Sequence, residues 1–411
     1  MRIQLIPRAG YPDFLDLPWN EPLDDWDNER LVVAARGIGT HVVRFVDYDG
    51  KLFALKELPE RVAQREYRFL RALEQEAIPA VEPVGTVRER PQLPNVLITR
   101  YLDFSLPCRL VIARELVPGP LDRIARGIAD LLVRLHLAGF YWGDCSLSNV
   151  LVRRDAGALA AYLVDAETSE RHPALTAGQR EYDLEIAEQN IYGELLDLEE
   201  GIGPDVSRDP IAVSAEVREC YEQLWDELTA EEAFTPGEGS RLDERVRRLN
   251  ELGFDVEEVD LVSTAEGYRL RVDPALLEPG HHRRRLHALT GLMAQENQAR
   301  RLLNDLARYR AELDRKGGRT VPETVAVHRW LSEVFEPAVA AVPGELWGKR
   351  DAAEVFHEAL EHRWFLSQQA GEDIGPMPAV EAYVADVLRH AADERAVLEP
   401  RVPERGDDED V

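Results

Sequence analysis

The order in which short apolar runs and long amphipathic stretches follow one another constrains the fold of this chain more than any other feature. Short alternating or apolar runs are typical of strands, and apolar residues spaced three or four apart are typical of helices. Strands are predicted at residues 31–35, 41–48, 52–58, 81–87, 95–101, 150–152 and 162–164, and helices at residues 60–76, 121–138 and 182–198. Strands thus come in groups on either side of single helices, which favours an α+β, bilobal domain over alternating βαβ units.

Two glycine-containing turns separate the first three predicted strands. Gly37-Ile38-Gly39 lies in the first turn and Asp49-Gly50 in the second. An Asp-Gly pair is a favoured two-residue hairpin turn, because both positions adopt positive φ. Two successive hairpins are therefore expected at the start of the domain.

A length of 411 residues exceeds what one hydrophobic core usually spans, so two or three domains are expected. The turn-rich stretch at 200–204 is the best candidate boundary. The expected organisation is an irregular N-terminal arm (1–27), a two-lobed domain (28–200, lobes 28–102 and 103–200), a mainly helical C-terminal domain with a small β-hairpin (201–402) and an acidic tail (403–411).

The charge balance narrows the classes of partner. The chain has 49 basic and 77 acidic residues and a formal charge of -28, which repels polyanions. Binding to nucleic acid is not expected, although a local basic patch stays possible. Only four of the basic residues are lysines, so Lys56, inside a predicted strand, is an unusual choice.

Cysteine spacing and hydropathy indicate the cellular location expected for this protein. Cys108, Cys145 and Cys220 lie far apart in the sequence, which suits neither a disulfide framework nor a metal cluster. The most apolar helical stretch is interrupted by Arg134 and His136, and no membrane span is expected. A cytoplasmic location is the expectation.

Four polar residues stand at positions that suit phosphoryl transfer. Lys56 lies late in the third strand, Asp144 and Asn149 lie five apart between a helix and a strand, and Asp165 ends a later strand. Phosphoryl transfer needs positive charge on the phosphates, oxygen ligands for a metal, and a base for the acceptor hydroxyl. Each of these residues, taken singly, has an ordinary explanation as an edge lysine, a turn residue or a helix cap. The order of the four along the chain is what favours a phosphoryl-transfer site.

The segments Tyr-Trp-Gly-Asp-Cys-Ser-Leu-Ser-Asn-Val-Leu-Val (141–152) and Tyr-Leu-Val-Asp (162–165) resemble the catalytic motifs of protein-kinase-like phosphotransferases. Residues 30–198 are most similar in style to the lipopolysaccharide kinase and aminoglycoside phosphotransferase branches. Segments at 295–301 and 361–365 resemble an uncharacterised actinobacterial family. The resemblance implies a protein-kinase-like fold followed by a mainly helical C-terminal domain.

By this resemblance, ATP and Mg²⁺ are the expected cofactors. Lys56 would contact the α- and β-phosphates and Glu66 would hold Lys56. Gly37 and Gly39 would let backbone amides approach the phosphates, although their loop is shorter than the kinase glycine motif. An exposed ion pair with neighbouring arginines is the other explanation for Glu66.

The same resemblance assigns the catalytic loop. Asp144 would accept the proton of the acceptor hydroxyl, and Asn149 and Asp165 would bind Mg²⁺. Trp142 and Gly143 precede Asp144 where kinases usually carry a histidine and then arginine or glycine. The hydrogen bond that this histidine gives to the metal-binding strand is therefore expected to be missing.

Two further residues frame the predicted site. Only 17 residues separate Asp165 from Tyr182, so an activation segment that switches by phosphorylation is not expected.

Asp183 either braces the catalytic loop or stabilises the dipole at the start of its helix.

The predicted function is an ATP- and Mg²⁺-dependent kinase that phosphorylates a hydroxyl of a small molecule, a glycan precursor or a protein. The alternatives are a pseudokinase that senses nucleotides and a nucleotidyl transferase on the same scaffold. The expected partners are the nucleotide, an unidentified hydroxyl acceptor and a protein partner recruited by the C-terminal domain.

Overall fold

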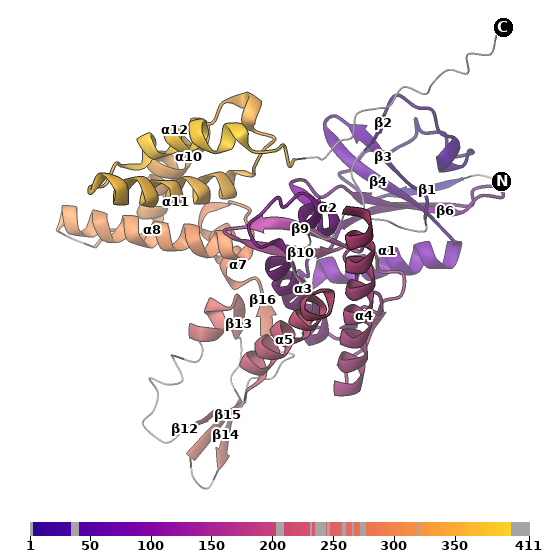
Figure 1. Cartoon of the computed structure of the whole chain (residues 1–411), viewed down its shortest axis with the longest axis horizontal. Helices are drawn as coiled ribbons and strands as arrows, with labels where there is room; N and C mark the ends of the chain where they lie inside the picture. Colours follow the sequence, from indigo (N-terminus) through magenta and orange to yellow (C-terminus); the bar gives the residue numbers. More distant parts are fainter. Residues whose placement is uncertain are drawn as a thin grey trace.

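The computed structural model describes residues 3–33, 41–202, 209–230, 232–234, 244, 247–256, 260–264, 267–271, 277–318 and 320–395. Two lobes built from sheet and helix are followed by a helical part that lies beside the second lobe (Figure 1). This arrangement confirms the predicted α+β class, the bilobal domain and the mainly helical C-terminal region.

The N-lobe is a six-stranded antiparallel sheet with one helix. Its strand order is β1-β5-β6-β4-β3-β2. The elements are β1 (Gln4–Pro7), β2 (Leu31–Val32), β3 (Val43–Tyr48), β4 (Lys51–Leu58), α1 (Glu60–Gln75), β5 (Glu82–Arg88) and β6 (Asn95–Arg100). Asp49 and Gly50 both have positive φ, 55° and 77°, which confirms the predicted Asp-Gly turn between β3 and β4.

The N-terminal arm is more regular at its start than its sequence indicates. Residues 4–7 form an edge strand on β5, and a short 3-10 turn follows at Leu23–Asp25. Four residues are too few to show a period of two, and the hydrogen bonds that make them a strand come from β5. Phe14, Trp19 and Trp26 are buried against the same sheet, so the arm packs on the N-lobe.

The C-lobe surrounds the long helix α3. Its elements are β7 (Ser105–Pro107), α2 (Cys108–Ala113), α3 (Pro120–Leu137), β8 (Phe140–Tyr141), β9 (Val150–Asp155), β10 (Ala158–Leu163), β11 (Glu170–Arg171) and α4 (Ala177–Ile202). β10, β9 and β7 form one antiparallel sheet, and β11 pairs with β8. Helix α3 starts with Pro120 at its first turn and ends before Gly139, whose φ is 76°.

The core of the C-lobe continues beyond residue 200. Helix α5 (Pro210–Thr229) packs on α3 and α4, and its Val213, Val217 and Tyr221 are buried in the same apolar cluster as α3. Phe254 belongs to that cluster too. We therefore propose that the two-lobed unit extends through α5, past the boundary predicted at 200.

Within the described residues, five short strands follow α5. The three-stranded sheet β12-β15-β14 consists of β12 (Glu232–Phe234), β15 (Gly267–Arg271) and β14 (Asp260–Thr264). The predicted hairpin thus exists as β14 and β15. The separate strand β13 (Phe254–Val256) pairs with β16 (Leu277–Pro279) and is not part of this hairpin.

The C-terminal helical unit comprises residues 281–395 and has a core of its own. It contains α7 (His281–Thr290), α8 (Glu296–Gly317), α9 (Glu323–Trp330), a π-helical turn (Leu331–Phe335), α10 (Glu336–Ala340), α11 (Ala352–Ala370) and α12 (Pro376–Asp386), with 3-10 turns at Gly344–Leu346 and Leu388–His390. Trp330 is fully buried between Phe335 and Phe356, with ring centroids 5.5 and 5.7 Å away.

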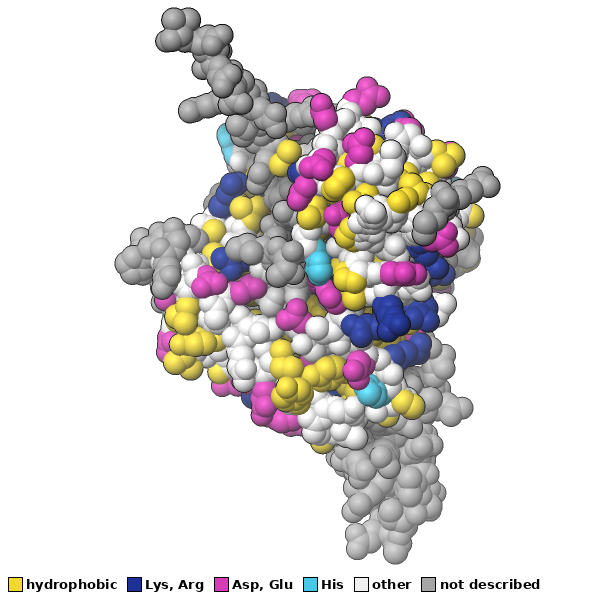
Figure 2. Space-filling model, turned by 90° about the vertical axis from the view of Figure 1, so that its right-hand side faces the viewer, with side chains coloured by type: hydrophobic (Ala, Val, Ile, Leu, Met, Phe, Trp, Pro, Cys, Tyr) yellow, Lys and Arg dark blue, Asp and Glu magenta, His cyan; other side chains and the backbone are white. Residues whose placement is uncertain are grey.

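The surface reflects the acidic composition. On the face shown in Figure 2, Asp and Glu side chains are spread widely, and Lys and Arg form one compact group at the right besides several isolated side chains. Among the described residues, no helix is long and apolar enough to cross a membrane.

Candidate active site

Lys56 lies at the centre of a partly buried cluster of charges between the lobes. Strand β4 turns Leu55 into the N-lobe core and Lys56 to the opposite face. The Lys56 Nζ donates to Asp165 Oδ2 at 2.6 Å and to both carboxylate oxygens of Glu66 at 3.3 Å. One ammonium group therefore joins the N-lobe to the end of β10.

Glu66 comes from the buried stripe of α1. It follows Ala63 by three residues and precedes Leu70 by four, so it shares their face, and its side chain is 1% exposed. The backbone amide of Ala166 also donates to Glu66 Oε1, at 3.5 Å. Glu66 is thus a buried partner of Lys56 and not an exposed ion pair of α1.

Burial and charge oppose each other in this cluster. Burial lowers the pKa of Lys56, but the charges of Glu66 and Asp165 outweigh it and raise the pKa above its usual value. Burial raises the pKa of Glu66 to about 7 despite the nearby Lys56 ammonium. The lysine therefore stays charged, as contact with phosphate oxygens requires.

Asp144 and Asn149 form the second half of the site. The Asn149 Nδ2 donates to Asp144 Oδ2 at 2.9 Å and to the Asp144 backbone oxygen at 3.0 Å. Asn190 on α4 donates from its Nδ2 to Asp144 Oδ1 at 3.1 Å and to the Cys145 oxygen at 3.3 Å. Two amide groups thus fix the orientation of the Asp144 carboxylate. Burial raises the pKa of Asp144, and the Asn149 hydrogen bond opposes this.

Trp142 connects the loop that carries Asp144 and Asn149 to the end of β10. Its indole Nε1 donates to the backbone oxygen of Asp165 at 2.9 Å, and its own backbone oxygen accepts from Thr168 Oγ1 at 2.9 Å and Ser169 Oγ at 3.1 Å. The expectation that no such hydrogen bond is made in this chain was wrong, because an indole N–H takes the place of the histidine donor.

Asp183 braces the same loop from α4. Its carboxylate accepts from the backbone amides of Trp142 at 2.8 Å and Gly143 at 2.7 Å, and His136 Nε2 lies 3.0 Å from it. Asp183 is fully buried, and α4 begins at Ala177, so Asp183 is not in its first turn. Of the two explanations for Asp183, the structure supports the loop brace.

The two halves meet through the β-sheet. The amide of Val164 donates to the Asn149 oxygen at 3.1 Å, so the residues before β9 and after β10 are held together. Lys56, Glu66 and Asp165 form one hydrogen-bonded group, and Asp144 and Asn149 form the other. Gly37 and Gly39 lie outside the described residues, and their role stays a prediction.

Asn190 is the polar group at this site that the sequence did not indicate. It lies 41 residues after Asn149 in the middle of a helix. No local spacing links it to Asp144. In the sequence, Trp142 is only a departure from the kinase catalytic-loop pattern, in which a histidine usually stands at this position.

The donor set suits Mg²⁺ together with a phosphate. Carboxylate and amide oxygens are the ligands that Mg²⁺ prefers, and phosphate oxygens usually complete its shell. Asn149 uses its Nδ2 on Asp144, which leaves its amide oxygen for a cation. Within the described part of the chain, no cluster of three or more His, Cys, Asp or Glu side chains could hold a metal alone.

Two family models match the chain. The Lipopolysaccharide kinase (Kdo/WaaP) family matches residues 50–192, and the Domain of unknown function (DUF4032) matches residues 223–388. A comparison with curated proteins found no match. A solved structure described as WaaP in complex with acyl carrier protein aligns at 17% identity and a TM-score of 0.35, over 54% of this chain and 88% of that one.

The two family matches cover different structural parts of the chain. The kinase match begins in the β3–β4 turn and ends within α4, so it contains Lys56, Glu66, Asp144, Asn149 and Asp165. The second match begins within α5 and ends after α12. The chain thus resembles the lipopolysaccharide kinase branch of the protein-kinase-like phosphotransferases in its first half and the DUF4032 family in its second.

Proposed function

We propose that this protein is an ATP- and Mg²⁺-dependent kinase that transfers the γ-phosphoryl group to a hydroxyl of a small molecule, a glycan precursor or a protein. The kinase-family match supports phosphotransfer chemistry in general. The observation that carries the finer proposal is the contact of Lys56 Nζ with both Glu66 and Asp165, beside a hydrogen-bonded Asp144 and Asn149.

Each residue has a role that follows from its charge and partners. When bound, ATP supplies the phosphoryl group and Mg²⁺ neutralises its charge. Asp165 and Asn149 would hold the cation through their side-chain oxygens. Lys56 would bind phosphate oxygens, and Glu66 would keep its ammonium group in place.

The acceptor side depends on Asp144. Its carboxylate would accept the proton of the acceptor hydroxyl while that oxygen bonds to the γ-phosphorus and the bond to the ADP leaving oxygen breaks. Asn190 would keep this carboxylate aimed at the acceptor. A reducing cytoplasm is the location we propose, since it supplies ATP and suits the free thiols of Cys108, Cys145 and Cys220.

The test is label transfer in cell extract. Purified full-length protein, Asp144→Ala and Asp197→Asn are incubated with extract and either γ- or α-labelled ATP. Asp197 is exposed on α4 and serves as the control carboxylate. The proposal expects label from γ-labelled ATP with wild type and Asp197→Asn, and its loss with Asp144→Ala.

Other outcomes identify the alternatives. Label from α-labelled ATP would indicate nucleotidyl transfer. A rise in melting temperature with ATP and Mg²⁺, without transfer of either label, would indicate a nucleotide-sensing pseudokinase.

A further inference from the structure

The β9–β10 hairpin begins and ends at the two proposed Mg²⁺ ligands. Asn149 directly precedes β9, and Asp165 lies two residues after the end of β10. The Val164–Asn149 hydrogen bond of 3.1 Å closes this base. Movement of the hairpin as a body therefore moves both ligands.

The other end of the hairpin enters the C-terminal helical unit, between α8 and α11. Asp155, 3% exposed, accepts from Asn297 Nδ2 at 2.9 Å and from the backbone amide of Gln298 at 2.8 Å. Gln298 lies in the first turn of α8, where backbone amides lack partners within the helix. A carboxylate of the C-lobe thus caps a helix of the C-terminal unit.

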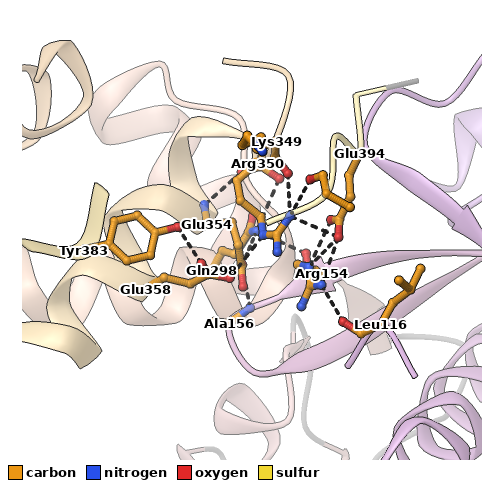
Figure 3. A network of polar contacts seen from close by, with 12 residues as sticks. Leu116, Arg154, Ala156, Gln298, Lys349, Arg350, Glu354, Glu358, Tyr383 and Glu394 are labelled. Atoms are coloured by element: carbon orange, nitrogen blue, oxygen red, sulfur yellow. Dashed lines mark hydrogen bonds and ion pairs between the residues drawn. The ribbon is translucent and has the colours of Figure 1, made fainter. Parts of the chain in front are cut away.

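Glu354 on α11 also holds the turn, next to Gln298 (Figure 3). Its Oε2 accepts from the Ala156 amide at 3.0 Å and from Gln298 Nε2 at 2.8 Å. Ala156 has a φ of 52°, a left-handed conformation that costs an alanine free energy. The bond to Glu354 therefore helps to fix a turn that alanine does not favour by itself.

Arg154 adds a buried ion pair. Its Nε lies 3.0 Å from Glu394 Oε2 and its Nη2 2.9 Å from Glu394 Oε1, while Arg350 Nη1 lies 3.0 Å from the same Oε1 (Figure 3). Glu394 is 3% exposed. Breaking a buried pair on one side leaves an uncompensated charge, so this contact resists separation.

The same C-terminal segment also reaches the neighbouring strand. The amide of Phe104, just before β7, donates to the backbone oxygen of Arg395 at 3.0 Å. β7 pairs with β9 in the three-stranded sheet. The C-terminal unit thus contacts the segment before β7 as well as the β9–β10 hairpin of this sheet.

The hairpin is stiff enough to transmit these contacts to its base. β9 and β10 pair without a register shift from Asp155↔Ala158 to Val150↔Leu163, and Tyr162 OH near the base donates to Gln295 Oε1 at 2.7 Å. Six residue pairs extend over roughly 20 Å. The hairpin is therefore a short, continuously paired connection between α8 and the proposed metal ligands.

We propose that the C-terminal helical unit acts as a brace that sets the position of Asn149 and Asp165 through the β9–β10 hairpin. This inference rests on the proposed function, because it assigns Arg154, Asp155, Gln298, Glu354 and Glu394 as positioning residues for its metal site. The matching DUF4032 segment is thereby given a role inside the kinase reaction itself.

The test uses full-length Arg154→Ala and the milder Asp155→Asn, which removes one acceptor oxygen. The control is Arg363→Ala, which breaks an exposed ion pair with Asp373 inside the same unit, away from the hairpin. Two quantities are measured. They are the Mg²⁺ concentration that half-saturates binding of a fluorescent ATP analogue, and amide hydrogen exchange of peptides that cover residues 149–165.

The brace predicts that both hairpin variants need about tenfold more Mg²⁺, the low end of the effect of losing residues that support metal ligands directly. Exchange should also quicken at residues 163–165, at the base, and Arg363→Ala should change neither quantity. Unchanged Mg²⁺ dependence and unchanged exchange at the base in both folded variants would overturn the brace. Wild-type protein that binds no ATP analogue with Mg²⁺ would overturn the proposed function, and the brace of its metal site with it.

Discussion

The indole Nε1 of Trp142 donates a hydrogen bond to the backbone oxygen of Asp165 at 2.9 Å. This bond ties the loop that carries the proposed base to the strand end that carries a proposed metal ligand. The chain therefore joins its two proposed catalytic segments through a residue type that the kinase pattern does not contain.

Trp142→Phe should lower kcat about tenfold, because a lost hydrogen bond of roughly 1 to 1.5 kcal/mol corresponds to about that factor. Steady-state kinetics measures it, with circular dichroism to show that the variant folds. An unchanged kcat in the folded variant would mean that this bond does not position Asp165.

Asn190→Ala should also lower kcat, by about tenfold, since one of the two amides that hold the Asp144 carboxylate is removed. The KM for ATP should stay unchanged, because Asn190 contacts Asp144, the proposed base for the acceptor hydroxyl. Gln189→Ala, an exposed amide on the same helix, is the matched control. Equal kinetics in the two variants would contradict the role of Asn190.

Gly127→Ala should destabilise the fold, although alanine is normally the better helix former. A Cβ at Gly127 would lie 2.6 Å from the Leu159 oxygen of β10, and such overpacking costs about 1 to 3 kcal/mol. Gly193→Ala on α4 meets nothing within 4 Å and should stabilise by up to about 1 kcal/mol. Urea unfolding measures both changes, and changes of the same sign would contradict the close packing of α3 on β10.

Stability should depend on pH through Glu354. Burial raises the pKa of Glu354 from 4.5 to about 7, in a setting whose charged groups include Asp351, Glu358 and Arg154. The folded state therefore binds this proton more tightly than the unfolded state. Its stabilising contribution is complete below about pH 4.5 and is lost as the pH rises through about 7.

Glu354→Gln should remove this part of the pH dependence. The decrease in free energy of unfolding from pH 4.5 to pH 8 should be smaller in the variant by on the order of 1 to 3 kcal/mol. Urea unfolding across this range measures it for both proteins. Parallel curves for wild type and variant would contradict the raised pKa.

The sequence predicted those site residues whose types are set by the chemistry and whose positions are set by local secondary structure. Lys56, Asp144, Asn149 and Asp165 were predicted as site residues because phosphoryl transfer needs these residue types at strand ends and in one loop, and because Asp144, Asn149 and Asp165 lie within one short segment. The structure brings them together in two hydrogen-bonded groups.

Contacts between distant segments could not be predicted in the same way. Asn190 meets Asp144 only because α4 packs beneath the loop, and Asp155 meets Gln298 across 143 residues. Residues 4–7 become a strand only because β5 offers its edge. The hydrophobic periodicity of one sequence indicates local secondary structure, and it does not show which distant residues come into contact.

The most direct test of phosphoryl transfer is Mg²⁺-dependent turnover of γ-labelled ATP by wild-type protein and Asp165→Asn in cell extract. Asp165→Asn removes one negative charge from the proposed cation site while it keeps the shape of the side chain. The account predicts γ-phosphoryl transfer by wild type and its loss in folded Asp165→Asn. Undiminished Mg²⁺-dependent transfer by that variant would contradict it.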